Sequence, residues 1–160
     1  MKLAIFSDTH GNYPLVLRAL DETGPVDGII HLGDEIEDAG MIEDIVDCPV
    51  VKVAGNCDHG TRAPRELKCT FAGVSFFITH GDAYNVKAGL GKLREKAHAS
   101  KFGVVLYGHT HIAAIEQVGE TTFVNPGCLH KASSTKSFAT ITIDAGTVHV
   151  DIIPLLEVLP

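Results

Sequence analysis

Five short apolar runs in this chain are each followed, within a few residues, by an Asp, Asn or His side chain. Short apolar runs bounded by Gly and polar residues are typical of buried β-strands. The runs are Leu3–Phe6, Gly28–Leu32, Val50–Ala54, Val74–Thr79 and Val104–Tyr107. In open α/β sheets, groups that follow strands gather beyond the carboxyl ends of the strands. The pattern therefore predicts an α/β fold with one polar rim.

The first three runs alternate with segments of helical pattern. Tyr13–Leu20 is a predicted helix, for which Asn12 and Pro14 supply start signals, and Glu37–Val46 is a second one. We expect the Asn12 side chain to cap the first helix. The βαβαβ order implies a parallel sheet with right-handed crossovers.

The rest of the chain adds hairpins and one further helix. Val86–Ser100 has an apolar stripe at helical spacing. The predicted hairpin pairs are Leu67–Phe71 with Val74–Thr79, Ile112–Gln117 with Thr121–Val124, and Phe138–Ile143 with Val148–Ile152. We therefore expect a single domain over residues 1–160. Its fold class is a layered α-β-β-α sandwich, with two mixed β-sheets facing each other and helices outside.

The charge and composition restrict the class of partner. The formal net charge is −7, which argues against a groove for long nucleic acid, because such grooves are lined with Lys and Arg. A small anionic substrate is compatible with this charge, since bound metals can reverse the local field. The four cysteines show no C-x-x-C spacing, and neither a signal peptide nor an apolar run of about 20 residues is visible. We therefore expect reduced thiols, no membrane contact and a cytoplasmic location.

The polar side chains that follow the runs are of the types that bind divalent metals such as Mn, Fe, Ni or Zn. They are Asp8, His10, Asp34, Asn56, His80, His109 and His111. Taken singly, each has a plainer reading, and a lone Gly-Asp after a strand is usually only a turn. Seven in a fixed order are too many for one ion and suit two ions that share a carboxylate. Two metals about 4 Å apart are a recurring device for cleaving phosphate esters.

The ordered set D-x-H, G-D, G-N, H, G-H-x-H resembles the calcineurin-like metallophosphoesterases. More closely, four segments are similar to the small phosphodiesterases of the YfcE type, whose group also includes the Vps29 scaffold. These segments are Ser7-Asp-Thr-His-Gly-Asn12, Gly55-Asn-Cys-Asp58, Gly108-His-Thr-His111 and Asn125-Pro-Gly127. The resemblance covers nearly the whole chain.

The resemblance implies a residue-by-residue ligand assignment with Asp34 as the bridge. One metal would be held by Asp8, His10, Asp34 and His111, and the other by Asp34, Asn56, His80 and His109. Mn is the first expectation for both metals, with Ni, Fe and Zn as alternatives. A hydroxide between the metals would attack phosphorus, with His109 or a neighbour as its orienting group. Two divalent ions and two aspartates leave a charge that suits hydroxide and a singly charged phosphodiester.

One position departs from the pattern of the related protein phosphatases. There a His follows the Asn and is thought to protonate the leaving group, whereas this chain has Cys57. A thiol is a poor general acid in place of imidazole, so we expect a preference for good leaving groups. Cys57 is kept as a catalytic candidate that donates a proton poorly, with a small residue that merely fits as its plainer reading. His59 is either the acid in its place or a solvent-exposed turn residue.

Other polar residues have weaker signals. We predict Asn12, Asn56 and Asn125 as substrate-binding residues, the last in a turn near the metals. Asp82 either orients a ligand imidazole or is an ordinary loop residue. His31 reads as a satisfied core histidine, and His98 and His149 as residues without a special role. His130 lies either at the cleft or on the surface.

The sequence therefore favours a metal-dependent phosphodiesterase with an open site, because no long insertion is present to build a lid. One alternative is a phosphomonoesterase of the same fold. The other is a non-catalytic scaffold like Vps29, in a group whose inactive members typically lack a metal-binding His. Since this chain keeps all seven ligands, we favour the enzyme. A homo-oligomer, dimer or tetramer, is also expected.

Overall fold

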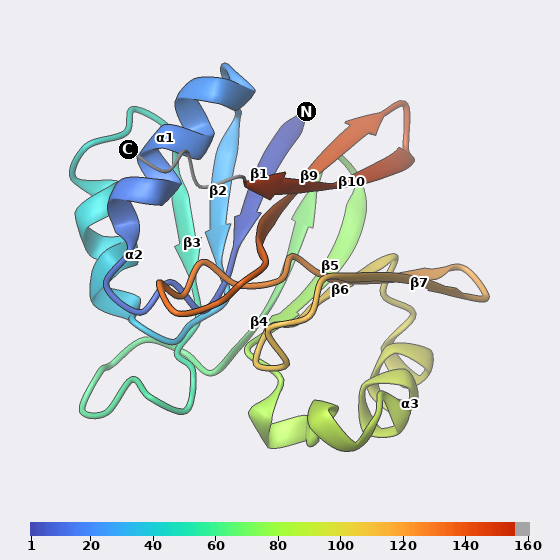
Figure 1. Cartoon of the computed structure of the whole chain (residues 1–160). Helices are drawn as coiled ribbons and strands as arrows, with labels where there is room; N and C mark the ends of the chain where they lie inside the picture. Colours follow the sequence, from blue (N-terminus) through green and yellow to red (C-terminus); the bar gives the residue numbers. More distant parts are fainter. Residues whose placement is uncertain (156–160) are drawn as a thin grey trace.

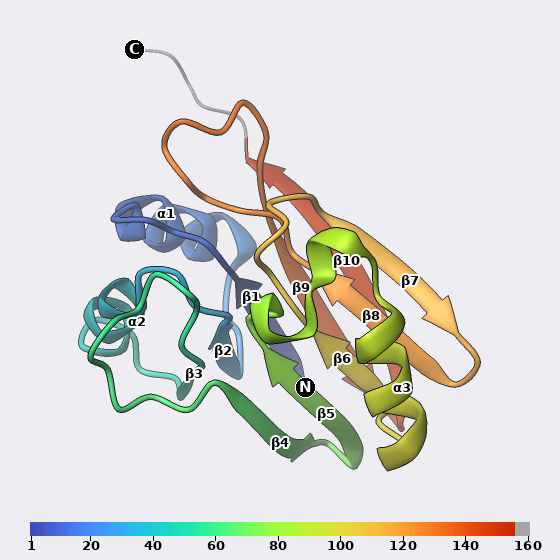
Figure 2. The same ribbon diagram turned by 90° about the horizontal axis from the view of Figure 1, so that it is seen from below.

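Two five-stranded sheets face each other in the computed structural model, which describes residues 1–155. The first sheet contains β1 (Lys2–Phe6), β2 (Gly28–His31), β3 (Val50–Lys52), β9 (Lys136–Asp144) and β10 (Thr147–Leu155). The second contains β4 (Glu66–Phe71), β5 (Val74–Thr79), β6 (Val104–Leu106), β7 (Ala114–Val118) and β8 (Thr121–Asn125). Helices α1 (Tyr13–Thr23) and α2 (Ile36–Glu43) flank the first sheet and α3 (Gly91–Ser100) the second (Figures 1 and 2). The predicted α-β-β-α layering is confirmed.

Each sheet has a parallel centre with antiparallel hairpins at its borders. In the first sheet β1, β2 and β3 run parallel, β9 pairs antiparallel with β1, and β10 pairs antiparallel with β9 at the edge. In the second sheet β5, β6 and β8 run parallel, while β4 and β7 are antiparallel edges. The parallel strands of each sheet therefore have their carboxyl ends on the same side of that sheet.

Alternation along the strands divides the apolar side chains among three cores. Ile5 and Phe76 are fully buried between the sheets, whereas their neighbours Phe6 and Phe77 belong to the outer cores under the helices. This follows from the period of two in a β-strand, which sends successive side chains to opposite faces. Full burial of such a side chain stabilises the fold by roughly 1.5–3 kcal/mol. Both faces of the central strands are covered, as parallel sheets require.

The predicted helix Val86–Ser100 is wrong at its beginning. Val86–Ala88 forms a 3₁₀ turn, η2, directly after another turn, η1 (Asp82–Tyr84), and α3 begins only at Gly91. Gly89 separates η2 from α3 with a φ of +128°, which no helical residue adopts. The apolar spacing was correct, because Val86 and Leu93 do pack in the same core, but a glycine breaks the backbone between them.

The predicted cap of the first helix is also wrong. Asn12 stands at the N-cap position of α1, yet its side chain makes no capping hydrogen bond. Its Nδ2 instead donates to the carbonyl oxygen of Leu129, at 2.7 Å. A contact between distant segments therefore takes the amide that the local sequence assigned to the helix. None of the helices in the described part of the chain has the length and apolar character needed to cross a membrane.

Candidate metal centre

All seven predicted ligand residues lie on loops that directly follow strands. Both sheets contribute to the set: the loops after β1, β2 and β3 carry Asp8, His10, Asp34 and Asn56, and those after β5 and β6 carry His80, His109 and His111. The structure brings these side chains together in two adjoining clusters.

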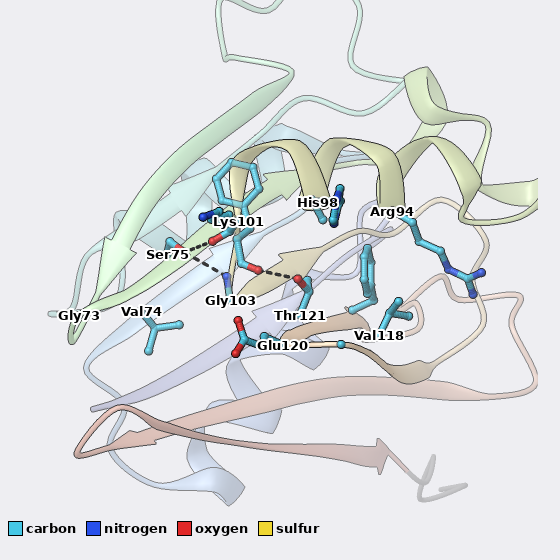
Figure 3. A pocket seen from close by; sticks show the side chains of 14 residues that line it. Gly73, Val74, Ser75, Arg94, His98, Lys101, Gly103, Val118, Glu120 and Thr121 are labelled. Atoms are coloured by element: carbon cyan, nitrogen blue, oxygen red, sulfur yellow. Dashed lines mark hydrogen bonds between the residues drawn. The ribbon is translucent and has the colours of Figure 1, made fainter.

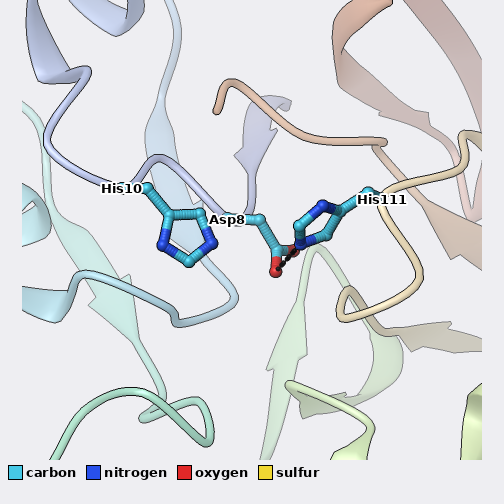
Figure 4. Close-up of side chains that lie close together, drawn as sticks. All are labelled: Asp8, His10 and His111. Atoms are coloured by element: carbon cyan, nitrogen blue, oxygen red, sulfur yellow. Dashed lines mark ion pairs between the residues drawn. The ribbon is translucent and has the colours of Figure 1, made fainter. Parts of the chain in front are cut away.

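The first cluster consists of Asp8, His10 and His111, whose ligand-type atoms all lie within 4.8 Å of one another. Figure 4 shows the Asp8 carboxylate between the two imidazole rings. Asp8 Oδ1 is 3.0 Å from His111 Nε2. Asp8 is fully buried and the two histidines are half-buried, so solvent reaches the cluster on the side of the histidines and not on the side of Asp8.

The second cluster consists of Asp34, His80 and His109, with Asn56 beside them. His80 Nε2 is 3.1 Å from Asn56 Oδ1, 3.2 Å from His109 Nδ1 and 3.4 Å from Asp34 Oδ2. Four potential ligand atoms from four loops therefore converge on one point.

Asp34 belongs to both clusters by distance. Its Oδ2 is 3.4 Å from His80 Nε2 and 3.9 Å from His10 Nε2. Asp8 Oδ1 is likewise within 4.0 Å of a histidine of each cluster, at 3.0 Å from His111 Nε2 and 4.0 Å from His80 Nε2, so both aspartates lie between the two clusters. This is the position that a bridging ligand needs.

The electrostatics of the two clusters suit cations. Asp8 Oδ1 is buried and has no hydrogen-bond partner within the described chain, although His111 Nε2 is close to it. Burial opposes ionisation of Asp8, but His111, His80 and Ser7 outweigh it and its pKa is lowered. Such an orphaned, ionised buried oxygen is costly unless it is paired or coordinates a metal. Two carboxylates, one amide oxygen and four imidazoles form a donor set that divalent transition metals accept.

Hydrogen bonds outside the two clusters orient several of the ligands. His80 Nδ1 donates to the carbonyl oxygen of Leu32 at 2.8 Å, which leaves Nε2 with a free lone pair. Asp8 Oδ2 accepts from the Ser7 hydroxyl and from the backbone N–H of His109. Asp34 Oδ1 accepts from the backbone N–H of Cys57 at 2.9 Å. Each carboxylate thus keeps one oxygen bonded to protein and presents the other to the site.

Five of the seven residues have a left-handed backbone. Their φ angles lie between 46° and 66°, and they are Asp8, His10, Asp34, His109 and His111. A non-glycine residue in this region costs energy and is common at functional sites. Of the glycines that directly precede ligand-type residues, Gly33 makes the turn itself, with a φ of +95°. At Gly55 and Gly108, a Cβ would instead collide with Asp34 and with Ser7, so close approach is the reason for glycine there.

Asp58 is the residue whose role the sequence did not reveal. Its carboxylate accepts four backbone N–H groups, from Gly55 and from the three successive residues 34–36. The distances are 2.7 to 2.9 Å. It thereby ties the loop after β3 to the loop after β2 and to the beginning of α2, where an anion is favourable. An Asp three positions after a strand-end glycine was the only signal.

His31 is confirmed as a satisfied core histidine. Its Nδ1 accepts from the backbone N–H of Gly33 at 3.2 Å, so the neutral ring carries its proton on Nε2, 3.1 Å from Thr9 Oγ1. Complete burial lowers its pKa to about 4. The ring therefore connects the loop of Asp8 and His10 with the loop of Asp34 without adding charge.

The residues considered as acids lie at one border of the centre. Cys57 is exposed as a residue. Partial desolvation of its sulfur, together with the neighbouring Asp34 carboxylate, raises the pKa of the thiol to about 11. Cys57 and His59 line a cavity of about 260 Å³. Asp82 pairs with Arg65, and His80 uses a carbonyl instead, so Asp82 orients no ligand imidazole in this structure.

Asn125 is buried behind the loop that carries His109 and His111. Its Nδ2 lies 2.9 Å from both the carbonyl oxygen of Gly108 and Thr110 Oγ1, and its Oδ1 accepts from the N–H of Gly127. In this place it holds the loop; its role in substrate binding stays a prediction, as do those of Asn12 and Asn56.

The remaining histidines are distributed as follows. His149 is exposed on β10, and His98 is exposed on α3 beside a cavity of about 640 Å³ that includes none of the seven predicted ligands (Figure 3). His130, by contrast, lies next to the first cluster, with its ring centroid 4.8 Å from that of His10. Of its two predicted locations, the cleft is the one observed.

A two-sheet sandwich with an Asp, Asn and His rim is the architecture of a metallophosphoesterase. A family model for the calcineurin-like phosphoesterase superfamily domain matches residues 1–146, so the chain belongs to this superfamily. It is 32% identical to the probable metallophosphoesterase YsnB of Bacillus subtilis, over 92% of this chain and 89% of that protein. It is 27% identical to the phosphodiesterase MJ0936 of Methanocaldococcus jannaschii, over 79% of this chain and 83% of that protein.

Solved structures agree with this membership. A protein of Streptococcus pneumoniae described as a predicted phosphoesterase superposes with a TM-score of 0.80 at 26% identity, covering 96% of this chain and 88% of that one. Vps29 of Entamoeba histolytica complexed with Zn²⁺ superposes with a TM-score of 0.75 at 18% identity, covering 96% and 99%. At that identity, the second likeness concerns the fold alone.

Proposed function

We propose that this protein is a phosphodiesterase that hydrolyses small phosphodiester substrates with two divalent cations. The observation that carries the proposal is the pair of adjoining clusters with Asp34 Oδ2 within reach of both. The relative named as a phosphodiesterase supports the substrate class. The ligand assignment proposed is the one expected from the sequence, with Mn²⁺ as the first cation to test.

The chemistry divides between the cations and the protein. Bound as a pair, divalent cations supply a hydroxide near neutral pH and neutralise the charge of a phosphate. The protein holds Asp8 and Asp34 with one oxygen each fixed by hydrogen bonds, and it fixes the tautomer of His80 through Leu32. Preorganised ligands of this kind need no rearrangement when the transition state forms.

Charge favours diesters over monoesters. The two aspartates offset half of the charge of two divalent cations, which leaves two positive charges for hydroxide and substrate. A singly charged diester completes this balance, whereas a dianionic monoester exceeds it by one. Cys57 bears on the leaving group instead: a thiol with a pKa of about 11 gives up its proton reluctantly to an alkoxide-like leaving group, so esters of acidic alcohols such as phenols should be the better substrates.

A Vps29-like scaffold is the alternative of another class. Its fold is the same, so the distinction depends on the site. We favour the enzyme because this chain retains all seven ligand-type residues in two closed clusters, including the costly left-handed backbone at five of them. Strain of this kind has no use in a surface that only binds proteins.

Metal-stripped protein tests the proposal directly. We expect bis(p-nitrophenyl) phosphate hydrolysis to vanish after chelation and dialysis and to return with Mn²⁺, and to a different extent with Ni²⁺, Fe²⁺ or Zn²⁺. p-Nitrophenyl phosphate, the matched monoester, should be the poorer substrate. Equal rates before and after full metal removal, verified by elemental analysis, would rule out the two-metal mechanism.

A further inference from the structure

His130 lies beside the first cluster without belonging to it. Its ring centroid is 4.8 Å from that of His10, at an interplanar angle of 76°, and 6.4 Å from that of His111, at 21°. The ring is half-buried. Its distance from both imidazoles is comparable to the width of a phosphate group, so a phosphate over the first cluster would lie within reach of it.

The backbone before His130 is fixed to the loop of Asp8. The N–H of the buried Leu129 donates to the carbonyl oxygen of Asp8 at 3.2 Å, and its carbonyl oxygen accepts from Asn12 Nδ2 at 2.7 Å. The carbonyl oxygen of His130 itself accepts from the N–H of Ser133 at 3.0 Å. The position of His130 relative to the cluster is thus set by hydrogen bonds on both sides of the residue.

The hydrogen bonding of the ring fixes its proton. The backbone N–H of Ala132 donates to His130 Nδ1 at 3.1 Å. Because Nδ1 must then present a lone pair, the ring is neutral and carries its proton on Nε2. Among residues 1–155, Nε2 has no hydrogen-bond partner. An N–H donor therefore stands next to the candidate metal centre, and no group among residues 1–155 accepts its hydrogen.

We infer that His130 is a substrate-binding residue that donates a hydrogen bond from Nε2 to a phosphate oxygen at the first cluster. The inference rests on the proposed function for the identity of the ligand. A phosphate bound at the first cluster would offer this donor an acceptor oxygen, which no group among residues 1–155 supplies to it. Asn12, whose amide nitrogen donates to the carbonyl oxygen of Leu129, helps to hold this donor in place.

Two amide variants distinguish the role of His130 Nε2 as a donor from the role of Nδ1 as an acceptor. In His130→Gln the side-chain amide reaches the place of Nε2 and keeps a donor there. In His130→Asn it reaches only the place of Nδ1, so it keeps the acceptor for Ala132 and loses the donor. His130→Ala loses both. A role in loop structure alone would be rescued by Asn, whereas a donor role would be rescued by Gln.

Two readouts on Mn²⁺-loaded protein test the inference: the Kd for inorganic phosphate by calorimetry, and KM and kcat for bis(p-nitrophenyl) phosphate. We expect His130→Ala and His130→Asn to raise both Kd and KM about tenfold, the equivalent of one hydrogen bond to a charged group, with His130→Gln within about twofold of wild type. Manganese content should be equal in all four proteins.

The outcomes separate this inference from the proposed function. If the wild type binds phosphate and His130→Ala weakens it without any diester turnover, the inference stands and the phosphodiesterase proposal falls. If the wild type hydrolyses diesters while His130→Ala matches it in Kd and KM, only the inference is overturned. It is equally overturned if the wild type does not bind phosphate, if Asn rather than Gln restores binding, or if His130→Ala loses manganese.

Discussion

At the scale of single residues, the centre depends on carboxylates that each serve two tasks. Asp34 accepts a backbone N–H with Oδ1 and presents Oδ2 to histidines of both clusters. In Asp8 the roles are divided in the same way: Oδ2 accepts the backbone N–H of His109, and Oδ1 has no hydrogen bond. A buried, ionised oxygen without a hydrogen bond is costly unless it is paired or coordinates a cation, and His111 Nε2 lies 3.0 Å from this oxygen. The two aspartates are therefore the most sensitive positions.

We predict that Asp34→Ala lowers the Mn²⁺-dependent diesterase kcat/KM by on the order of 10³-fold, because the proposed bridge holds both cations. Steady-state kinetics with measured metal content would show it. His98→Ala, on the exposed side of α3, is the matched control and should stay within about twofold of wild type. A fully active Asp34→Ala protein would refute the ligand assignment.

Cys57 is the residue at which this chain departs most from the related phosphatases. A neutral thiol with a pKa of about 11 is a weak acid, so an alkyl leaving group receives little help. We predict that Cys57→His shifts the ratio of kcat/KM toward monoesters of ordinary alcohols, since imidazolium donates near neutral pH. A general acid is worth about 10²–10⁴-fold, so partial recovery is measurable.

The comparison requires both ester classes in both variants, with two cations per chain verified in each. An unchanged ratio in fully loaded proteins would mean that Cys57 only fills space. His59→Ala would then be the next variant, because His59 lines the same cavity of about 260 Å³. The exposed His149 supplies the control for loss of an imidazole remote from the centre.

At the scale of elements, the loops after β2 and β3 are held together by one side chain. Asp58 accepts four backbone N–H groups. Two belong to the residues directly before α2, one to the first residue of α2 and one to Gly55. The arrangement brings Gly55 so close to Asp34 that no larger residue fits. The two strands thus deliver Asp34 and Asn56 as a single unit, although Asp34 lies in the β2–α2 connection and Asn56 in the β3–β4 connection.

We predict that Asp58→Asn destabilises the protein by about 3 kcal/mol, because an amide presents N–H groups where two of the four donors need an acceptor. Urea unfolding would measure the loss, and calorimetry should show weaker Mn²⁺ binding. Asp151→Asn, on exposed β10, is the control and should be nearly neutral. If both variants unfold at the same urea concentration as wild type, Asp58 does not hold the loops.

At the scale of the whole molecule, the candidate centre lies where the two sheets meet. The loops after β1, β2 and β3 on one side and after β5 and β6 on the other carry the predicted ligands. A cation bound by both sets would therefore link the two halves of the sandwich, and any opening between the sheets would release it. Binding to the folded state alone stabilises that state by mass action.

We predict that saturating Mn²⁺ raises the Tm of the stripped protein by about 10 °C. A ligand at 1,000 times its Kd contributes about 4 kcal/mol, and each kcal/mol shifts the Tm of a domain of this size by about 2–4 °C. Differential scanning calorimetry would measure it, and Asp34→Ala should abolish most of the shift. An identical Tm with and without Mn²⁺ would show that the ion does not bind the folded protein preferentially.

Local patterns determined most of the fold and the identity of the seven ligand-type residues. The period of two along each strand predicts which residues face the cores, and a polar residue after each strand end falls on the same rim. These signals span only a few neighbouring positions, so they can be recognised in one sequence without knowledge of the tertiary structure. The same short range explains the error at Gly89, where helical spacing hid a backbone break.

Tertiary structure alone decided which distant segments meet. Asn12 bonds to Leu129 rather than to its own helix, Asp58 accepts N–H groups from the β2–α2 connection, and His130 comes to lie beside His10. Each of these contacts depends on the packing of whole strands against one another, which places residues that are far apart in the chain within a few ångströms. No local propensity encodes such a distance, because it exists only after the two sheets have closed around their common core.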